Sequence, residues 1–283
     1  MRSVQVRGAL NSPGTGGSVL AMPPTPAETL REQYKDGSKL DARIRLHARF
    51  STNRYGMFRW IFDRFALRAD ACVLELGAGT AQLWTRNADR IPPRWRIVLS
   101  DLSPGMLGEV RAQVARIGRP FALTAADVQT LPFRDAAFDA VIANHMLYHV
   151  QDIPRGIREI RRVLVPGGLC YAATFSQANM RELDAIALRF LGVDLSKAAF
   201  RFGLENGGDL MRASFPKVEL ERYPDSLVIT EAQPVMDYLN STMLHSAAPE
   251  ESKAALRSYL ESEIAARGSI KVSKDAGIFI ARA

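Results

Sequence analysis

Short apolar runs alternate with amphipathic segments through the middle of the chain. The segment after Ser103 begins as a helix should, with Ser103 at the N-cap and Pro104 at the first helical position. The apolar runs predict five strands, at residues 73–76, 95–101, 121–126, 138–144 and 169–175. Strands that alternate with helices at this spacing predict a parallel sheet covered by helices on both faces.

The last third of the chain predicts the remainder of the same sheet. Its elements are helices within 177–214 with a loop at 200–207, a strand at 218–223, helices at 231–241 and 249–266, and a strand at 277–281. We therefore expect an α/β fold with a doubly wound, mostly parallel sheet of seven strands. Because additions to such a fold set what it binds, we expect the insertions at 177–214 and 226–268 to cover the site.

The sequence divides into four expected parts. They are a flexible tail (1–26), an N-terminal helical lid (27–69), a core with the first five strands (70–176), and the rest of the sheet with covering helices (177–283). The tail is rich in Gly, Ser, Pro and Thr and lacks the apolar segment of a secretory signal, and Met22 is a second candidate start. No apolar run approaches the roughly 20 residues that span a bilayer.

The first predicted strand leads into a turn with two glycines. Gly77 and Gly79 allow backbone angles and a close approach that a Cβ would block, which is typical of a loop that binds a nucleotide-type cofactor. A dinucleotide loop has glycine or alanine where this chain has Gln82. Glu75 would also repel a pyrophosphate, whereas S-adenosylmethionine carries a sulfonium and an ammonium that an acid attracts. The loop therefore favours S-adenosylmethionine over NAD.

Two further acids end the next two strands. Asp101 follows the second strand, where an acid can accept hydrogen bonds from both ribose hydroxyls, and Asp127 follows the third. Each acid taken alone is equally well explained as a helix cap or a solvated turn residue. Because successive parallel strands end at one edge of a sheet, Glu75, Asp101 and Asp127 together indicate a single cofactor site.

At these positions the chain resembles the class I S-adenosylmethionine-dependent methyltransferases, in particular the small-molecule group typified by ubiquinone-biosynthesis methyltransferases. The resemblance covers roughly residues 70–175 and implies a Rossmann-like sheet. The residues that carry it are Glu75-Leu76-Gly77-Ala78-Gly79-Thr80, Asp101-Leu102-Ser103, Ala126-Asp127-Val128, Leu131-Pro132-Phe133, Phe138-Asp139-Ala140-Val141 and Leu164-Val165-Pro166-Gly167-Gly168. One departure is Ala81, where many members have a third glycine.

The resemblance implies which residues hold each end of the cofactor. Glu75 and the turn Gly77-Ala78-Gly79 would hold the methionine end, and Asn144 would approach the same end.

At the other end, Asp101 would bind the ribose. Leu102 and Met106 would pack on the adenine. Asp127 would accept a hydrogen bond from the adenine amino group, and Val128 would donate its backbone N–H.

The implied chemistry is methyl transfer from the sulfonium by in-line displacement, in which alignment supplies much of the acceleration. A general base is needed only if the acceptor must lose a proton. His145 and His149 follow the fourth strand and have a suitable ordinary pKa, although His149 is as readily a brace for its loop. In the lid, Tyr34 and His47 are candidate acceptor-pocket residues, with helix capping or a surface hydrogen bond as an equal alternative.

Several related chemistries lack their motifs. No Asn/Asp-Pro-Pro-aromatic sequence follows the fourth strand, which argues against methylation of base amino groups. Neither cysteine lies in a Pro-Cys loop, which argues against a covalent route to 5-methylcytosine. Asn144 stands where metal-dependent catechol-type enzymes place an aspartate, so we predict no metal.

Charge is unevenly distributed along the 283 residues, whose formal net charge is +7. Residues 1–70 hold 12 Lys and Arg against 6 Asp and Glu, and aromatic residues interleave with the arginines, a composition that can bind RNA. The alternative is an amphipathic helix packed on the sheet. Met57, Trp60, Ile61 and Phe65 recur at helical spacing, which favours this alternative.

The sequence thus predicts a metal-independent methyltransferase that acts on an O, N or C atom of a small molecule. Two cysteines, Cys72 and Cys170, are expected to be buried thiols, and their number suggests a reducing, cytoplasmic location. Two alternatives remain open. One is an RNA methyltransferase that uses Arg43, Arg45 and Arg49, and the other is a non-catalytic regulatory protein that binds the cofactor. No membrane span is expected, and the sequence leaves the oligomeric state open.

Overall fold

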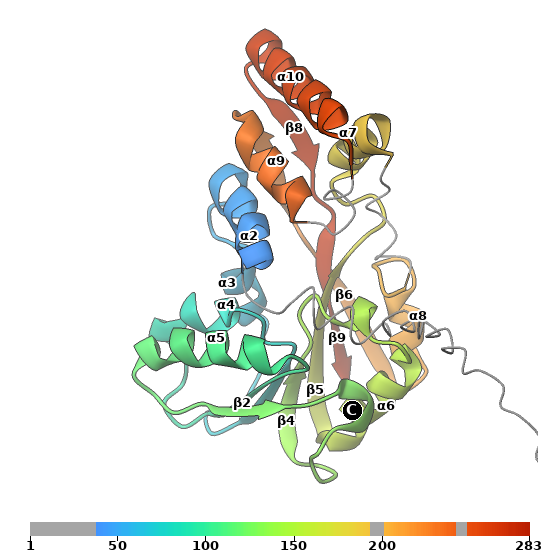
Figure 1. The fold of residues 1–283 in the computed structure, drawn as a ribbon. Coiled ribbons are helices and arrows are strands. Elements are labelled where there is room, and N and C mark those ends of the chain that lie inside the picture. Colours follow the sequence, from blue (N-terminus) through green and yellow to red (C-terminus); the bar gives the residue numbers. More distant parts are fainter. Residues whose placement is uncertain (1–37, 193–200, 242–247) are drawn as a thin grey trace, which may run out of the picture.

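The computed structural model describes residues 38–192, 201–241 and 248–283. The expected tail at 1–26 and the candidate Tyr34 lie outside the described residues. The described chain forms a lower body around a large sheet, with a second tier of helices above it (Figure 1).

A seven-stranded sheet forms the centre of the body, as the sequence predicts. Its strands are β1 (Cys72–Leu76), β2 (Arg96–Asp101), β3 (Ala122–Ala125), β4 (Phe138–Ile142), β5 (Leu164–Phe175), β6 (Lys217–Tyr223) and β9 (Ala276–Arg282). They lie in the order β3-β2-β1-β4-β5-β9-β6. Only β9 runs antiparallel to its neighbours, so the sheet is mostly parallel.

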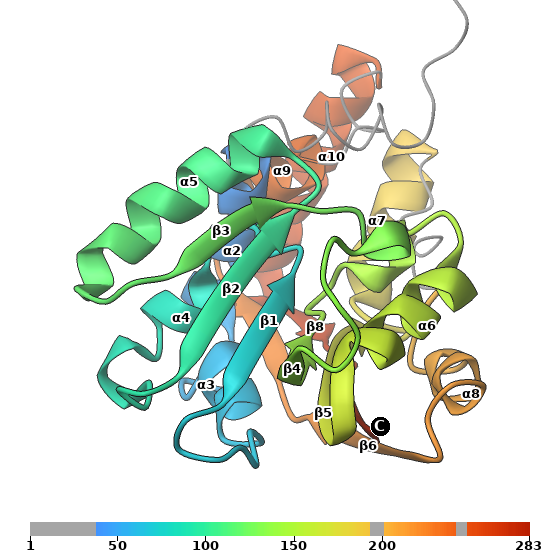
Figure 2. The same cartoon turned by 90° about the horizontal axis from the view of Figure 1, so that it is seen from below.

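Helices cover both faces of this sheet, which makes it doubly wound (Figure 2). On one side lie α3 (Met57–Phe62), α4 (Gln82–Thr85) and α5 (Pro104–Val114), and on the other lie α6 (Ile153–Val163) and α8 (Gly207–Arg212). Short 3-10 turns connect them: η1 (Ala88–Arg90), η2 (Ala115–Ile117), η3 (Val128–Thr130) and η4 (Leu147–His149). Ser103 caps α5 through its side chain, as expected.

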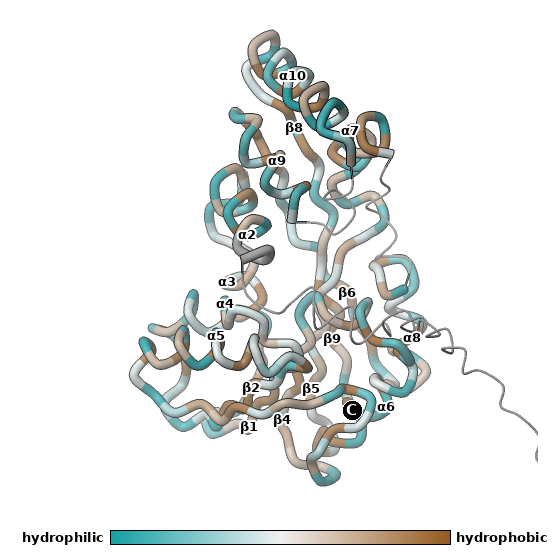
Figure 3. The backbone as a smooth tube through the Cα atoms, in the orientation of Figure 1, coloured by the Kyte–Doolittle hydropathy of each residue, from teal (hydrophilic) through white to brown (hydrophobic). Residues whose placement is uncertain are grey.

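Successive residues of the central strands point to opposite faces, and both faces are buried. On β4, Ala140 and Ile142 join the core beneath α3, α4 and α5, whereas Val141 joins the core beneath α6 and α8. Continuous apolar strands are what a sheet buried on both faces requires, and hydrophobic residues accordingly concentrate along the strands in Figure 3.

The upper tier, which we call the cap, has an apolar core of its own. It consists of α2 (Ser38–Phe50), α7 (Arg181–Leu191), α9 (Ala232–Asn240), α10 (Glu250–Arg267) and a two-stranded sheet of β7 (Ser226–Ile229) and β8 (Ile270–Ser273). Leu46, Leu227, Leu239, Leu256 and Leu260 are fully buried in this core. The cap is therefore held together by the same hydrophobic effect as the body.

Three local features differ from the sequence-based expectation. The helix expected over 81–89 ends at Thr85, because the Asn87 side chain donates to the carbonyl of Leu83 (2.7 Å) and competes with the helix ladder. β5 begins at Leu164 rather than at residue 169, with a register irregularity opposite β4. β7 and β8 were not expected, because each is four residues long and pairs with a strand far away in the sequence.

Most aromatic residues of the N-terminal arm after Tyr55 pack on the sheet as the amphipathic alternative predicts, whereas Tyr55 is exposed and Phe50 packs in the cap. Trp60, Ile61 and Phe62 of α3 are buried against the sheet, and Phe65 packs on Tyr171 with ring centroids 4.7 Å apart. These rings therefore contribute to the core and are not free to stack on bases.

Both cysteines are free thiols, and Cys170 is buried while Cys72 is half-buried. Burial raises the pKa of Cys170 to about 12, so this thiol is not a nucleophile at neutral pH. Within residues 38–192, 201–241 and 248–283, no helix combines the length and apolar character that a bilayer crossing requires.

Substitution at two glycines should test the packing of the sheet. A Cβ at Gly277, on β9, would lie 2.5 Å from the carbonyl oxygen of Glu221, whereas a Cβ at Gly108, inside α5, meets nothing within 4 Å. We expect Gly277→Ala to lower the free energy of unfolding by about 1–3 kcal/mol and Gly108→Ala to raise it by about 0.5–1 kcal/mol. Urea unfolding of both variants measures this, and equal effects would contradict the described packing of β9.

Candidate functional site

The glycine turn after β1 is shaped by positive backbone angles and by a close neighbour. Gly77 has φ 63° and Gly79 has φ 55°. A Cβ on Gly77 would lie 2.9 Å from the Cβ of Met146, which follows β4. Glycine is therefore required here for its conformation and for the space it leaves. The N–H of Ala78 donates to the carbonyl of Ser100 on β2 (2.9 Å), which fixes the turn against the next strand.

Ala81, which departs from the family pattern, keeps the backbone conformation of a glycine. Its φ is 55°, its side chain is fully buried, and α4 begins directly after it. A left-handed alanine costs roughly 1–2 kcal/mol relative to an ordinary conformation. The turn thus keeps the shape expected of a third glycine in spite of the substitution.

Glu75 is a buried carboxyl group at the end of β1, with only 3% of its surface exposed. Trp84 Nε1 donates to its Oε2 (2.6 Å), and Asn144 Nδ2 donates to its Oε1 (3.3 Å). Burial raises the pKa of Glu75 to about 8, nearby Asp101 adds to this rise, and the two hydrogen bonds oppose it. No cation among the described residues pairs with this carboxyl. A bound cation would supply the missing partner and favour the ionised form.

Two other buried polar atoms near the turn have no hydrogen-bond partner among the described residues. They are Oδ1 of Asn144 and Oγ1 of Thr80. A buried acceptor without a partner costs about 1–3 kcal/mol, so such groups commonly await a ligand. Together with Glu75 they offer acceptors to an ammonium group. The residues present therefore fit the methionine end of S-adenosylmethionine.

Asp101, at the end of β2, lies against the same turn. Its Oδ2 accepts from the N–H of Gly79 (3.2 Å) and its Oδ1 accepts from the N–H of Ser103 (2.9 Å). Burial raises its pKa while these backbone hydrogen bonds lower it. The structure thus brings Asp101 next to Glu75 through the glycine turn, as expected for a shared cofactor site.

Asp127 occupies a neighbouring but separate position. It begins η3, where its Oδ1 accepts from the N–H of Gln129 (2.8 Å), and both its oxygens accept from the Gln129 side chain (3.1 Å each). Val128 and Met106 are buried beside this edge, and Leu102 is half-buried. Asp127 can therefore act as the N-cap of η3 and also accept a hydrogen bond from a cofactor, because each carboxylate oxygen has two lone pairs.

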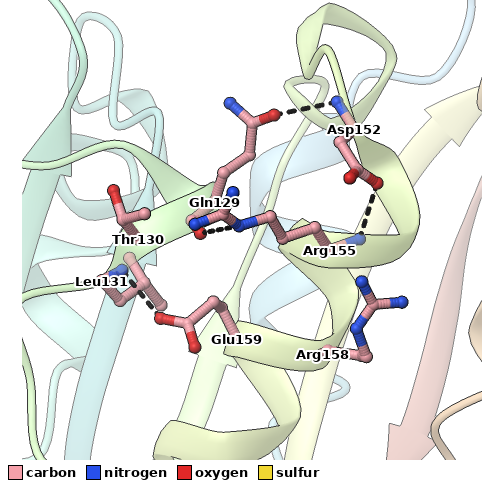
Figure 4. A pocket seen from close by; sticks show the side chains of 7 residues that line it. All are labelled: Gln129, Thr130, Leu131, Asp152, Arg155, Arg158 and Glu159. Atoms are coloured by element: carbon pink, nitrogen blue, oxygen red, sulfur yellow. Dashed lines mark hydrogen bonds between the residues drawn. The ribbon is translucent and has the colours of Figure 1, made fainter.

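The residues that line the surface depression next to Asp127 join two elements of the fold and do not form a second site. The depression measures about 700 Å³ and is lined by Gln129, Thr130, Leu131, Asp152, Arg155, Arg158 and Glu159 (Figure 4). Arg155 Nε donates to the carbonyl of Gln129 (2.8 Å), and Glu159 accepts from the N–H of Leu131 (2.9 Å). These contacts tie η3 to α6 and so hold the Asp127 segment in place.

His145 and His149 lie just past β4, where the sequence places the acceptor. His145 has φ 52°, its N–H donates to Ala173 (2.9 Å), and its ring stacks on Phe175 at 6.2 Å between centroids. Burial and then Lys274 lower the pKa of His145 to about 4. Burial, Arg43 and Arg201 lower the pKa of His149 to about 4. Both rings are neutral at pH 7, and they are weaker bases than the sequence suggests.

Several residues that shape the site were not singled out from the sequence. Trp84 holds Glu75, Met146 covers Gly77, and Lys274 lowers the pKa of His145. The role of Trp84 could have been inferred from the sequence, because Trp84 lies in the helix that follows the glycine turn. Nothing in the sequence indicates that Lys274 influences residue 145. Among the described residues, no group of three or more His, Cys, Asp or Glu side chains is arranged to hold a metal.

The sequence matches known proteins over this region. A family model described as a methyltransferase domain matches residues 74–172. A malonyl-[acyl-carrier protein] O-methyltransferase of Halorhodospira halophila is 30% identical over 234 residues, which cover 78% of each chain. A ubiquinone/menaquinone biosynthesis C-methyltransferase of Hahella chejuensis is 33% identical over 121 residues, 42% of this chain and 49% of that protein.

Solved structures share the fold. Phosphoethanolamine N-methyltransferase 2 of Haemonchus contortus, solved with S-adenosyl-L-methionine, has a TM-score of 0.58 at 15% identity and covers 92% of this chain and 60% of that one. An S-adenosylmethionine-dependent methyltransferase of Aquifex aeolicus has a TM-score of 0.52 at 11% identity and covers 92% of this chain and 99% of that one.

The Asp101 side chain should contribute strongly to cofactor affinity. We expect Asp101→Ala to weaken binding of S-adenosylmethionine by about 1–3 kcal/mol, because it leaves buried donors without an acceptor. Asp209→Ala is the matched control, since Asp209 is exposed on α8 and pairs with Arg212. Calorimetric titration of both variants measures the difference, and equal affinities would contradict the assignment of Asp101.

The raised pKa of Glu75 should make cofactor binding depend on pH. Free Glu75 is protonated below about pH 8, and a bound cation favours the carboxylate, so binding should release a proton. Between about pH 6 and 8 the affinity should rise with pH, by up to about tenfold per pH unit. Calorimetry in buffers of different ionisation enthalpy counts the proton. Glu75→Gln should bind more weakly at pH 8 and remove this dependence, and a wild-type profile that is already flat would contradict the mechanism.

Proposed function

The chain belongs to the class I S-adenosylmethionine-dependent methyltransferases, and we propose that it methylates an O, N or C atom of a small-molecule acceptor without a metal. S-adenosylmethionine is the cofactor, and when bound it supplies a methyl group already activated on a sulfonium. The protein's own task is to bind and align the two reactants.

The observation that carries this proposal is the buried carboxyl of Glu75 beside Asn144. The Asn144 side chain donates from Nδ2 to Glu75, and its buried Oδ1 has no hydrogen-bond partner among the described residues. The next residue, His145, interacts electrostatically with His47 of the cap. The end of β4 therefore connects a site suited to a cation, on the body, with a histidine of the cap, and we place the acceptor between the two.

The names of two relatives support a small organic group as the acceptor, either free or attached to a carrier. The Halorhodospira halophila relative is named for a malonyl group on acyl-carrier protein, and the Hahella chejuensis relative is named for ubiquinone and menaquinone biosynthesis. Transfer to oxygen is favoured, because a relative that matches 78% of both chains is an O-methyltransferase.

The RNA alternative rests on the arginines of α2, and their contacts weaken it. Arg43 donates to the side chain of Ser241 (3.1 Å), and Arg49 pairs with Glu231. Both arginines therefore hold α2 against α9, and Arg45, the third named arginine, is exposed. We retain a cytoplasmic location as part of the proposal, on the support of the two free thiols.

Methyl transfer from labelled S-adenosylmethionine tests the proposed function directly. The full-length protein is incubated with the small-molecule fraction and, separately, with the RNA of the same cell extract. We expect label in small molecules and formation of S-adenosylhomocysteine above a heat-killed control. Label confined to RNA would favour the RNA alternative, and cofactor binding without turnover would favour the regulatory one.

The same assay measures the role of His145. We expect His145→Ala to lower turnover by about tenfold or more while cofactor affinity changes little, because the ring lies on the acceptor side of β4. Lys253→Gln, on α10 and far along the chain from the site, serves as the control. Unchanged turnover in His145→Ala would show that the acceptor is held elsewhere.

A further inference from the structure

A buried ion pair lies where the body meets the cap. β6 continues into β7 through Asp225, and β8 continues into β9 through Lys274, so the two residues face each other between the two sheets. Lys274 Nζ lies 2.6 Å from Asp225 Oδ2, and the two side chains are only 9% and 1% exposed. Lysine and aspartate are rarely buried to this extent unless they are paired.

Asp225 and Lys274 differ in how many of their hydrogen-bonding groups have partners among the described residues. Asp225 Oδ1 accepts from Ser51 Oγ (2.7 Å) and from the N–H groups of Asn53 (3.0 Å) and Ser226 (2.9 Å). Lys274 makes one hydrogen bond to a described residue, to Asp225, although an ammonium carries three donors. The carboxylate is therefore nearly saturated, and the ammonium retains donors for another group.

Two histidines from different tiers share this environment. Lys274 lowers the pKa of His145, at the end of β4, and of His47, on α2 of the cap, and His145 and His47 also interact with each other. His47 Nδ1 is buried and has no hydrogen-bond partner among the described residues. An unpartnered buried nitrogen costs about 1–3 kcal/mol unless a ligand satisfies it.

Cationic side chains contribute to the electrostatics around these rings. Burial is the main reason that the pKa of His47 falls to about 3, and Lys274 is the next largest influence, which Asp225 opposes less strongly. Burial and then Lys274 lower the pKa of His145, and burial, Arg43 and Arg201 lower that of His149. Because burial disfavours a charge of either sign, only the contribution of the cations indicates surroundings that suit an anion.

We propose that Lys274, His47 and His145 form the subsite that binds a carboxylate group of the methyl acceptor. This inference rests on the proposed function, since it assigns the chemical class of the acceptor. His47 Nδ1 and the unused N–H donors of Lys274 supply the hydrogen bonds, and Asp225 holds the ammonium in position. His145 lies on the side nearest the cofactor residues, next to Asn144 in the sequence.

The donors match a carboxylate better than a phosphate. The subsite offers the unused N–H donors of one ammonium and the N–H groups of two neutral imidazoles, and a carboxylate has two oxygens to accept them. Asp225 already balances the charge of the ammonium, so the match rests on hydrogen bonding. Recognition of a phosphate favours the forked guanidinium of arginine. The arginine at this edge of α2, Arg43, donates to Ser241.

Histidine-selective NMR of the full-length protein tests the subsite, because the chain has four histidines. The probes are hexanoate and hexanamide, which differ in charge at one end. Both are titrated into protein saturated with S-adenosylhomocysteine, whose binding is first measured by calorimetry. We expect hexanoate to move the His47 and His145 signals and to raise the pKa of both rings, since Lys274 influences both and Asp225 and His145 also influence His47. Hexanamide should do neither.

A charge-neutral double variant provides the decisive comparison. Lys274→Met with Asp225→Asn removes the ammonium without leaving an unpaired buried carboxylate. We expect hexanoate binding to weaken at least about tenfold there, which corresponds to about 1.4 kcal/mol. The control Lys253→Gln, on α10, should bind as the wild type does. His47→Gln is a second variant that keeps the ion pair and should also weaken binding.

The outcomes separate the two proposals. Failure to bind S-adenosylhomocysteine would contradict the proposed function. Binding of S-adenosylhomocysteine with equal responses to hexanoate and hexanamide, or with no response to either, would overturn the carboxylate subsite alone. Unchanged hexanoate affinity in the folded double variant would overturn it as well.

Discussion

The ion pair between Asp225 and Lys274 is the interaction on which the relation of body and cap depends. Both strand connections between the tiers pass through it, and the end of α2 is fastened to it through Ser51 and Asn53. Isolated burial of either charge would cost several kcal/mol, so each residue requires the other. The pair therefore helps to set how the cap joins the body, and it holds the ammonium that lowers the pKa of His47 and His145.

Two regions that favour ligands of opposite charge meet at the end of β4. On the body side, the buried carboxyl of Glu75 lacks a cation among the described residues, and this side suits a sulfonium cofactor. On the cap side, Lys274 and the neutral histidines suit an anion. Asn144 and His145 are consecutive and belong to the two sides. The proposed subsite would thus bring a cationic methyl donor and an anionic acceptor together while keeping their binding groups separate.

The low pKa values of His145 and His149 argue against the general-base role that the sequence suggests for them. From sequence, His145 and His149 have an ordinary pKa that suits a general base. In the structure, burial and nearby cations lower both values to about 4, so the rings act better as hydrogen-bonding groups than as proton acceptors. Alignment of the reactants then carries more of the catalysis than proton removal.

The sequence by itself determined the sheet, the glycine turn and the cofactor class, because strand periodicity, Gly77, Gly79 and the acid at Glu75 are local signals. It did not reveal β7 and β8, the pairing of Lys274 with Asp225, or the burial of the histidines. These features depend on contacts between residues far apart in the chain, such as Ser226 with Ser273. Burial and the distance to other charges are properties of the folded chain, so only the tertiary structure decided the electrostatics of the acceptor side.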